Sequence, residues 1–512
     1  MWRSTFIVSA MTLLSRILGL VRDMVLLNVF GAGGIMDAFL VAFKIPNFFR
    51  RLFAEGAFSQ AFIPVLTEYK TKKLHQDVQI LISRAAGSLT LILSLLTVFT
   101  MLAAPAVIWL FAPGFADEPD KFELAVDLLR LTFPYLLLMS LTAFASSVLN
   151  SYGSFATASF APVLLNLTMI AAAWWCAPLF DPSIMALGWA VVVAGVLQLA
   201  IQIPELWKKK LLIPPKVDFK HEGVRRILKL MLPALFGVSV VQINLLLNTV
   251  WASFMQTGSV TWLYSAERLT ELPLGLIGIA IATVILPALS AKNAEQDMEK
   301  FRALIDWAAR VIVLVGIPAS IAMFMLASPI IQALFQHGEF GAHDVAMTAL
   351  ALQGMSLSIL TFMLIKIFAP AFYARQDTKT PVKIGLISVG VNIALNVVLI
   401  GWFKWINYDA PHVALALSST VASCVNAGML YWYLHRQDVY RFGGHWRVLI
   451  LRYGVANIAM VAVLWVALPY YPTEAHQLVR VMALLGLCVA GGGAYAVGLL
   501  AMGFRPRHIA KV

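Results

Sequence analysis

The chain consists of long apolar blocks that are separated by short polar or Gly/Pro-containing breaks. A helix that spans a bilayer needs about 20 mostly apolar residues, and the blocks have this length. Fourteen spans are predicted, at residues 5–29, 37–66, 82–112, 124–150, 158–179, 183–203, 225–255, 259–290, 303–334, 345–373, 381–403, 411–434, 446–468 and 478–503. The pattern therefore predicts an all-α polytopic membrane protein, whose helix ends are placed to within a few residues.

Composition and charge support this interpretation and set an orientation. Hydrophobic residues make up 60% of the 512 residues, and charged residues only 12%. The net charge is +12, and the positive charges lie mainly in short loops: if the N-terminus is inside, the inside segments hold 25 Lys and Arg residues. The loops on the other side hold only Lys121 and Lys404. Because cytoplasmic loops are enriched in Lys and Arg, we expect both termini in the cytoplasm and no nucleic-acid partner. The first apolar run is expected to be a retained helix, since no small-residue cleavage site follows it.

The sequence lacks the common signatures of enzymes and metal sites. The three cysteines, Cys176, Cys424 and Cys488, lie far apart in apolar segments, so neither a disulfide nor a zinc site is predicted. No phosphate-binding loop, HExxH or GxSxG motif occurs. The aqueous segments reach only about two dozen residues, which is too short for a catalytic domain. We therefore expect a protein that is not an enzyme and has no metal site or cofactor.

Helices 1–6 and 7–12 of this prediction form two copies of one unit. Pro64 and Pro287 end similar apolar runs and lie 223 residues apart, while Tyr152 and Tyr373 follow the fourth helix of each copy and lie 221 apart. The predicted domains are an N-lobe (1–203), a cytoplasmic linker (204–224), a C-lobe (225–434) and two further helices with the C-terminal tail (435–512). Transporters commonly bind their substrate between two such repeats.

Charged residues inside the spans are the strongest functional signal, because each costs at least about 2.5–3.5 kcal/mol in hydrocarbon. Helix 1 carries Arg16, Arg22 and Asp23. Helix 2 carries a single stripe of charged residues, which are Asp37, Lys44, Arg51 and Glu55. Arg50 lies beside the stripe, and Pro46 is expected to interrupt the helix. Helix 8 carries Glu267, Arg268 and Glu271, spaced to meet on one face.

These charges predict a water-filled cavity lined by helices 1, 2, 7 and 8. Structural salt bridges are the alternative, but pairing alone does not explain why the charges occupy the second helix of both repeats. Arginine binds phosphate bidentately and stays ionised when partly dehydrated. The expected ligand is therefore an anion carrying a phosphate or diphosphate, and the carboxylates would hold the arginines when it is absent.

Asparagine pairs are a weaker signal. Asn244 and Asn248 lie one turn apart on helix 7, as do Asn392 and Asn396 on helix 11. Their carbonyl oxygens suit a hard cation, whereas hydrogen bonds between helices are the simpler explanation.

Several longer motifs stand out along the chain: SRILGLVRD at 15–23, FGAG at 30–33, DAF at 37–39, FRRLFAEGAFSQAFIP at 49–64, YSAERL at 264–269 and FYARQDTKTP at 372–381. Together they resemble the MurJ (MviN) family of lipid II flippases, in the multidrug/oligosaccharidyl-lipid/polysaccharide exporter superfamily. The resemblance covers essentially the whole chain, and the run at 49–64 is its most specific part.

The resemblance implies a function as well as a fold. It implies fourteen helices in two lobes around a cationic cavity, with helices 13 and 14 forming a groove for a lipid tail. It implies transport of lipid II, the undecaprenyl-diphosphate-linked peptidoglycan precursor, to the outer leaflet of a bacterial inner membrane. It implies functional roles for Arg16, Arg22, Arg51 and Arg268 and for the carboxylates Asp23, Asp37 and Glu55, and Glu267 stands where Asp is common in the family. With the charge pattern, the predicted substrate-binding residues are Arg16, Arg22, Asp23, Asp37, Arg50, Arg51 and Arg268, and the predicted gate or cavity carboxylates are Glu55, Glu267 and Glu271.

The resemblance extends to coupling and partners. A cation site in some members matches Asn248, Asn392 and Asn396 in part, so coupling to a monovalent cation or to the membrane potential is left open. Expected partners are lipid II, membrane lipids and cell-wall synthesis proteins, and the chain is expected to be a monomer.

Alternative functions make different demands on the sequence. An exporter of another polyprenyl-linked oligosaccharide fits the same cavity, whereas an exporter of cationic drugs calls for a more anionic or aromatic one. A membrane glycosyltransferase or ligase calls for a large outside loop, and a non-transporting scaffold for cell-wall enzymes makes no use of the charges.

Overall fold

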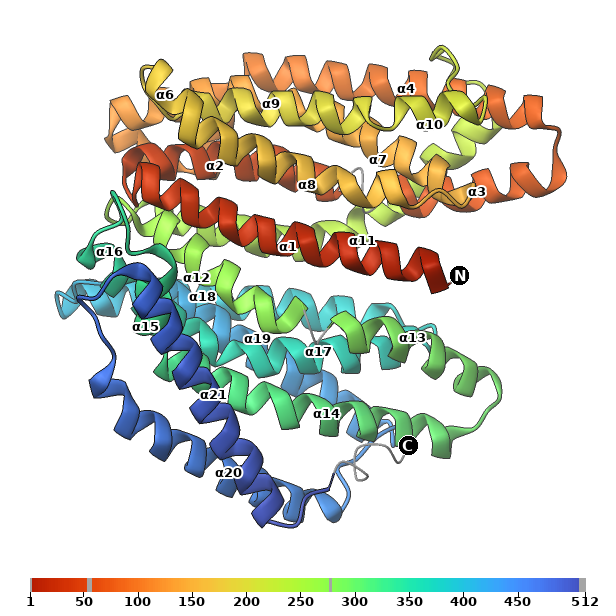
Figure 1. Cartoon of the computed structure of the whole chain (residues 1–512). Helices are drawn as coiled ribbons and strands as arrows, with labels where there is room; N and C mark the ends of the chain where they lie inside the picture. Colours follow the sequence, from red (N-terminus) through yellow and green to blue (C-terminus); the bar gives the residue numbers. More distant parts are fainter. Residues whose placement is uncertain (1, 53–57, 276–278, 506–512) are drawn as a thin grey trace. The chain divides into compact units, whose positions relative to one another are not determined.

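The computed structural model describes residues 2–52, 58–275 and 279–505, and in these ranges every regular element is a helix (Figure 1). Ten helical segments are long and apolar enough to cross a membrane by length and composition. The prediction of an all-α polytopic membrane protein is thereby confirmed.

The chain divides into two compact units, Met1–Thr261 and Trp262–Val512. The helices that lie in the first unit are α1 (Trp2–Phe30), α2 (Gly34–Arg50), α3 (Ser59–Lys72), α4 (His75–Leu102), α5 (Ala104–Phe111), η2 (Pro113–Asp117), α6 (Pro119–Thr132), α7 (Tyr135–Ser151), α8 (Ala156–Ala171), η3 (Ala172–Cys176), η4 (Ala177–Leu179), α9 (Met185–Ala200), α10 (Ile203–Lys208) and α11 (Glu222–Ser253). The lobe boundaries predicted from the repeat, at 203 and 225, stay a prediction.

Helix α12 (Ser259–Pro273) begins in the first unit and continues into the second. The remaining helices of the second unit are α13 (Ile279–Ala294), α14 (Met298–Met325), α15 (Ala327–Phe335), α16 (Ala342–Ser356), α17 (Ser358–Tyr373), α18 (Lys379–Trp405), α19 (Val413–Arg436), α20 (His445–Ala467), η6 (Leu468–Tyr470) and α21 (Gln477–Ala501). Thirteen predicted spans fall on one or two of these helices, and the span 158–179 covers α8, η3 and η4. Breaks inside the spans include those near Ala103, Pro134, Leu326 and Leu357.

The expected interruption at Pro46 is wrong, because α2 continues through Pro46 to Arg50. Proline has no N–H for the carbonyl four residues earlier, which is that of Ala42. The hydroxyl of Thr132 in α6 donates to the Leu128 carbonyl of its own helix at 2.7 Å and lies 3.5 Å from the Ala42 oxygen. The freed carbonyl thus has a polar neighbour from α6, which helps a membrane helix to tolerate the proline. Arg51 and Leu52 continue as a π-helical turn.

The linker between α10 and α11 is fixed along α4. Ser83 connects to it twice, donating from its hydroxyl to the Pro214 carbonyl (2.6 Å) and accepting at its carbonyl from the Lys216 N–H (3.0 Å). Gly87, one turn further along α4, lies so close that a Cβ there would overlap the backbone of Lys216. We call residues 210–218 the strap.

Ion pairs secure both the strap and the helix that follows it. The Arg84 guanidinium lies 2.9 Å from the Asp218 carboxylate. At the start of α11, Arg226 lies 2.7 Å from Glu68 in α3, and its hydrogen bond and charge lower the pKa of Glu68. The start of α11, which the charge pattern predicts to be cytoplasmic, is therefore fixed to α3.

In the second unit, Asp306 of α14 anchors the start of α20. Its carboxylate accepts hydrogen bonds from Tyr440 Oη (2.9 Å) and Trp446 Nε1 (2.7 Å). His445 Nε2 lies 3.0 Å from the same carboxylate, and Arg310 Nε lies 3.1 Å from it. Burial, and then the Asp306 charge, raise the pKa of Tyr440 far above its usual range, so its hydroxyl remains a donor.

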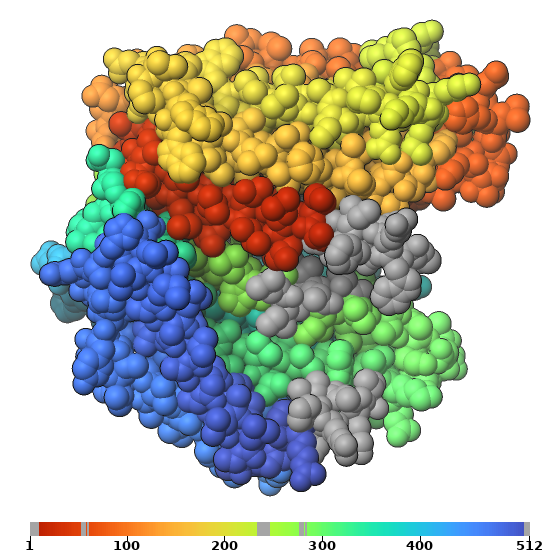
Figure 2. Space-filling model, viewed as in Figure 1, coloured from red at the N-terminus to blue at the C-terminus, as the bar shows by residue number. Residues whose placement is uncertain are grey.

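Next to this anchor, the α20–α21 pair packs on α14. Trp446, Leu449 and Tyr453 of α20 are buried against Ala309 and Val313. The pair lies along one side of the second unit, where it is blue in Figure 2. Asp306 thus links a polar cluster at the helix end to the apolar packing of the pair.

We expect Gly87→Ala to lower the thermal stability of the purified protein, because the new methyl group would push the strap off α4. Gly390→Ala in α18 is the matched control, since a Cβ there meets nothing within 4 Å and alanine favours helix by about 1 kcal/mol. Melting temperatures in detergent provide the measurement. Equal stability of Gly87→Ala and the wild type would contradict the close contact.

We expect Asp306→Ala to loosen the start of α20, because it leaves the buried donors of Tyr440 and Trp446 without an acceptor, at about 1–3 kcal/mol each. Limited proteolysis near residues 437–444 and the melting temperature report the change. Glu299→Ala in the same helix as Asp306 is the control, because the Glu299 side chain is exposed and exposed pairs contribute about 0–1 kcal/mol. Similar effects of both substitutions would argue against the anchor.

Candidate functional site

Asp37 lies in the first turn of α2 and is 1% exposed. Its carboxylate accepts from the backbone N–H of Gly258 (2.7 Å) and of Thr261 (2.9 Å), and from the Thr261 hydroxyl (2.6 Å). These donors belong to the loop before α12 and to its first turn. Asp37 therefore caps α12 from a distant part of the sequence, where a negative charge also favours the helix dipole.

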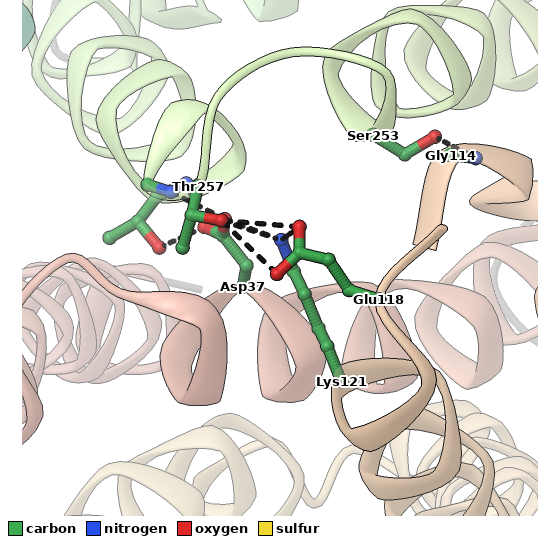
Figure 3. A network of polar contacts seen from close by, with 8 residues as sticks. Asp37, Gly114, Glu118, Lys121, Ser253 and Thr257 are labelled. Carbon is green, nitrogen blue, oxygen red and sulfur yellow. Dashed lines mark hydrogen bonds and ion pairs between the residues drawn. The ribbon is translucent and has the colours of Figure 1, made fainter. Parts of the chain in front are cut away.

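Lys121 of α6 completes this network (Figure 3). Its ammonium lies 3.7 Å from Asp37 and 3.3 Å from Glu118, and donates to the Thr257 hydroxyl at 3.5 Å. The Lys121 side chain is buried and stands over the Phe115 ring, 4.4 Å from the ring centroid. The sequence indicated Lys121 only as one of two basic residues in the outside loops, and its partners were missed.

A backbone contact next to this network draws η2 to the end of α11. The Gly114 N–H donates to the Ser253 hydroxyl at 3.1 Å (Figure 3), and a Cβ on Gly114 would overlap the Ser253 backbone. We call Asp37, Gly114, Glu118, Lys121, Ser253, Thr257, Gly258 and Thr261 the α12 cap network. It joins four segments of the first unit at one end of its helices.

Arg22 and Asp23 form a buried pair in α1, exposed by 7% and 3%. Two nitrogens of Arg22, Nε (2.9 Å) and Nη2 (2.5 Å), donate to Asp23 Oδ1. Arg22 Nη1 donates to Asn166 Oδ1 of α8 at 3.2 Å, and Asn166 Nδ2 donates to the Ser15 carbonyl at 3.0 Å. The sequence identified the first two residues and missed Asn166, which carries no charge and so gave no signal.

The other predicted cations of the first unit are less enclosed. Arg16 is half-buried and Arg51 is exposed, while Arg50 Nε donates to Asn47 Oδ1 at 3.2 Å. Lys44 Nζ donates to the Thr249 hydroxyl of α11 at 3.3 Å. Asp37 and Lys44 both contact the stretch 249–261, which fits the predicted stripe on one face of helix 2.

Glu55, the last member of that stripe, lies outside the described residues. Its predicted place on the stripe and its role as a gate or cavity carboxylate stay predictions.

In the second unit, Arg268 and Glu271 meet as their spacing predicts. Arg268 Nη1 lies 3.5 Å from Glu271 Oε2, and the two side chains are 33% and 55% exposed. Glu267 is half-buried one turn before Glu271. The geometry of the pair is thus confirmed, and the substrate-binding role of these residues stays a prediction.

The asparagines of helix 11 pair with each other. Asn396 Nδ2 donates to Asn392 Oδ1 at 2.9 Å, and Asn392 Nδ2 donates to the Ser419 hydroxyl of α19 at 3.2 Å. Both are fully buried, and Asn248 is buried in the first unit. Among the described residues no group of three or more His, Cys, Asp or Glu could hold a metal. The hydrogen bonds account for the position of Asn392 and Asn396, and the cation site stays a prediction.

Comparison with known proteins gives the family. The family model described as "Lipid II flippase MurJ" matches residues 26–485. A Haemophilus influenzae protein named "Probable lipid II flippase MurJ" is 45% identical over 518 residues, covering 98% of this chain and 99% of the relative. A Burkholderia cenocepacia protein named "Lipid II flippase MurJ" is 40% identical, covering 99% of this chain and 98% of the relative.

Solved structures show the same fold. One described as "Lipid II flippase MurJ, inward closed conformation" has a TM-score of 0.78 at 23% identity, covering 99% of this chain and all of the other. An inward-facing multidrug resistance MATE family transporter of the MOP superfamily has a TM-score of 0.65 at 14% identity, covering 85% and 98%. On the near-complete sequence match, the chain belongs to the MurJ lipid II flippase family.

Proposed function

We propose that this protein moves lipid II from the cytoplasmic to the periplasmic leaflet of a bacterial inner membrane by alternating access. Family membership across nearly the whole chain is the observation that carries the substrate. The buried Arg22–Asp23 pair in α1 supports the mechanism, because ionisable residues inside membrane spans are costly and commonly mark substrate pathways.

The substrate's diphosphate would bind to arginines in a central cavity, while its prenyl tail stays in lipid. Guanidinium groups match phosphate in two parallel hydrogen bonds. In the structure the Asp23 carboxylate binds Arg22, and Glu271 lies beside Arg268. The diphosphate would replace these carboxylates, so the arginines would never be left without a partner in the membrane.

The proposal includes fourteen spans in two six-helix repeats plus two helices, with both termini in the cytoplasm. In this orientation the α12 cap network lies at the periplasmic end of the first unit. Asp37 would hold the start of α12 in the described conformation, and its release would accompany opening toward the periplasm. The membrane potential would favour outward movement of a negative headgroup by about 2.3 kcal/mol per charge per 100 mV.

The first experiment is transfer of lipid II across proteoliposomes by the purified protein. We expect Arg22→Ala and Arg268→Ala to abolish transfer while the protein still inserts into the membrane, because each loses a phosphate-binding group. Arg130→Ala is the control, since Arg130 is 46% exposed and lies 3.3 Å from the exposed Asp127.

Normal transfer by either arginine variant would overturn the proposal that arginines in a central cavity bind the diphosphate. Transfer of another polyprenyl-linked oligosaccharide in preference to lipid II would favour the alternative exporter.

The second experiment tests the cap network through access to Ser253, which is 4% exposed. We expect Asp37→Ala to speed labelling of a Ser253→Cys variant by a membrane-impermeant maleimide. Losing one partner of a buried charge pair costs about 3–5 kcal/mol, which would open the loop before α12. Asp120→Ala, an exposed carboxylate on α6, serves as the control. Labelling that Asp37→Ala leaves unchanged would show that the network does not hold this end closed.

A further inference from the structure

Asn166 connects two points of α1 from the neighbouring helix α8, which runs beside it (Figure 1). Its side chain is 5% exposed, and both ends of the amide are used. Nδ2 donates to the Ser15 carbonyl at 3.0 Å, and Oδ1 accepts from Arg22 Nη1 at 3.2 Å. One side chain thus ties the backbone of α1 to a guanidinium seven residues later.

The spacing makes this double contact possible. Residues seven apart lie on the same face of a helix, about two turns from each other. Gly19, buried midway between Ser15 and Arg22, has no side chain to hold the neighbouring helix away. The amide therefore sets the position of Arg22 relative to the axis of α1.

The residue type matters as much as its place. Asp23 already supplies one carboxylate oxygen to two nitrogens of Arg22. A second carboxylate at position 166 would hold the guanidinium more tightly and compete with an incoming phosphate. An amide accepts the same N–H without adding charge. The Asn166 amide therefore orients Arg22 and leaves the guanidinium able to exchange the Asp23 carboxylate for a phosphate.

We propose that Asn166 is a positioning residue for Arg22, which fixes the guanidinium plane so that it can exchange the Asp23 carboxylate for the substrate's diphosphate. The inference rests on the proposed function. It assigns a role in substrate binding to a neutral residue that does not itself touch the substrate.

Two variants separate orientation from charge. Asn166→Leu keeps a similar volume and removes both hydrogen bonds, and we expect it to weaken lipid II binding roughly tenfold, as for the loss of one hydrogen bond to a charged group. Asn166→Asp should impair binding and transfer at pH 8, where the new carboxylate is ionised. Thr168→Val on the same helix is the control, because the Thr168 hydroxyl contacts only backbone carbonyls of α8.

Rescue by a conservative variant provides a readout that a merely structural role would not move. A protonated aspartic acid donates and accepts at the same places as asparagine, but lowering the pH to 4.5 would leave most of this aspartate ionised, because the Arg22 guanidinium stabilises the carboxylate. Rescue by Asn166→Gln is therefore the second readout, since this variant keeps an amide that donates and accepts. We expect Asn166→Gln to bind lipid II more tightly than Asn166→Leu, and equal binding by these two variants would overturn the positioning role.

A double-mutant cycle completes the test. In an Arg22→Ala background, Asn166→Leu should cause no further loss of binding, because the group that it positions is absent. Additive losses would overturn the proposal. If the wild type fails to transfer lipid II, the proposed function fails; if the wild type transfers it and Asn166→Leu binds equally well, only the positioning role fails.

Discussion

A charge or a backbone polar group inside a membrane must have a partner, and this requirement governs the interior of the protein. Hydrocarbon provides no hydrogen bonds, so an unpaired group costs several kcal/mol. The structure meets the requirement with Asp23 and Asn166 around Arg22, and with backbone amides around Asp37. The Arg22–Asp23 pair is local to α1, whereas the contacts of Asn166 and Asp37 join segments that are distant in sequence.

The same requirement separates contacts that fix the fold from contacts that can exchange. The strap on α4 and the Asp306 anchor use several hydrogen bonds at once, so breaking them would orphan several groups together. The Arg22–Asp23 pair is different, because a phosphate can replace the carboxylate without leaving the guanidinium bare. An enclosed ion pair is therefore compatible with a binding role.

Fixed contacts on either side of a helix also shape how it can move. The start of α11 is tied to α3 through Arg226 and Glu68, and its far end meets η2 through Ser253 and Gly114. The cap network then holds the first turn of α12 through Asp37. These contacts hold α11 at its two ends. A change in the shape of α11 must therefore occur between the ends or follow the release of one of them.

The sequence by itself determined the helices, their all-α class and the local pair of Arg268 and Glu271, because apolar periodicity and i,i+3 spacing depend only on nearby residues. It also selected Arg22, Asp23 and Asp37, since an ionisable residue within an apolar span is conspicuous in any fold. Only the tertiary structure decided what those residues contact. Asn166, Lys121 and the amides of Gly258 and Thr261 lie far away in the chain, and no local pattern marks them as partners. The expected break at Pro46 was wrong for a related reason, since the surroundings of the proline come from α6, which packs along α2. Partners of buried polar groups are set by how helices pack, which a local pattern does not encode.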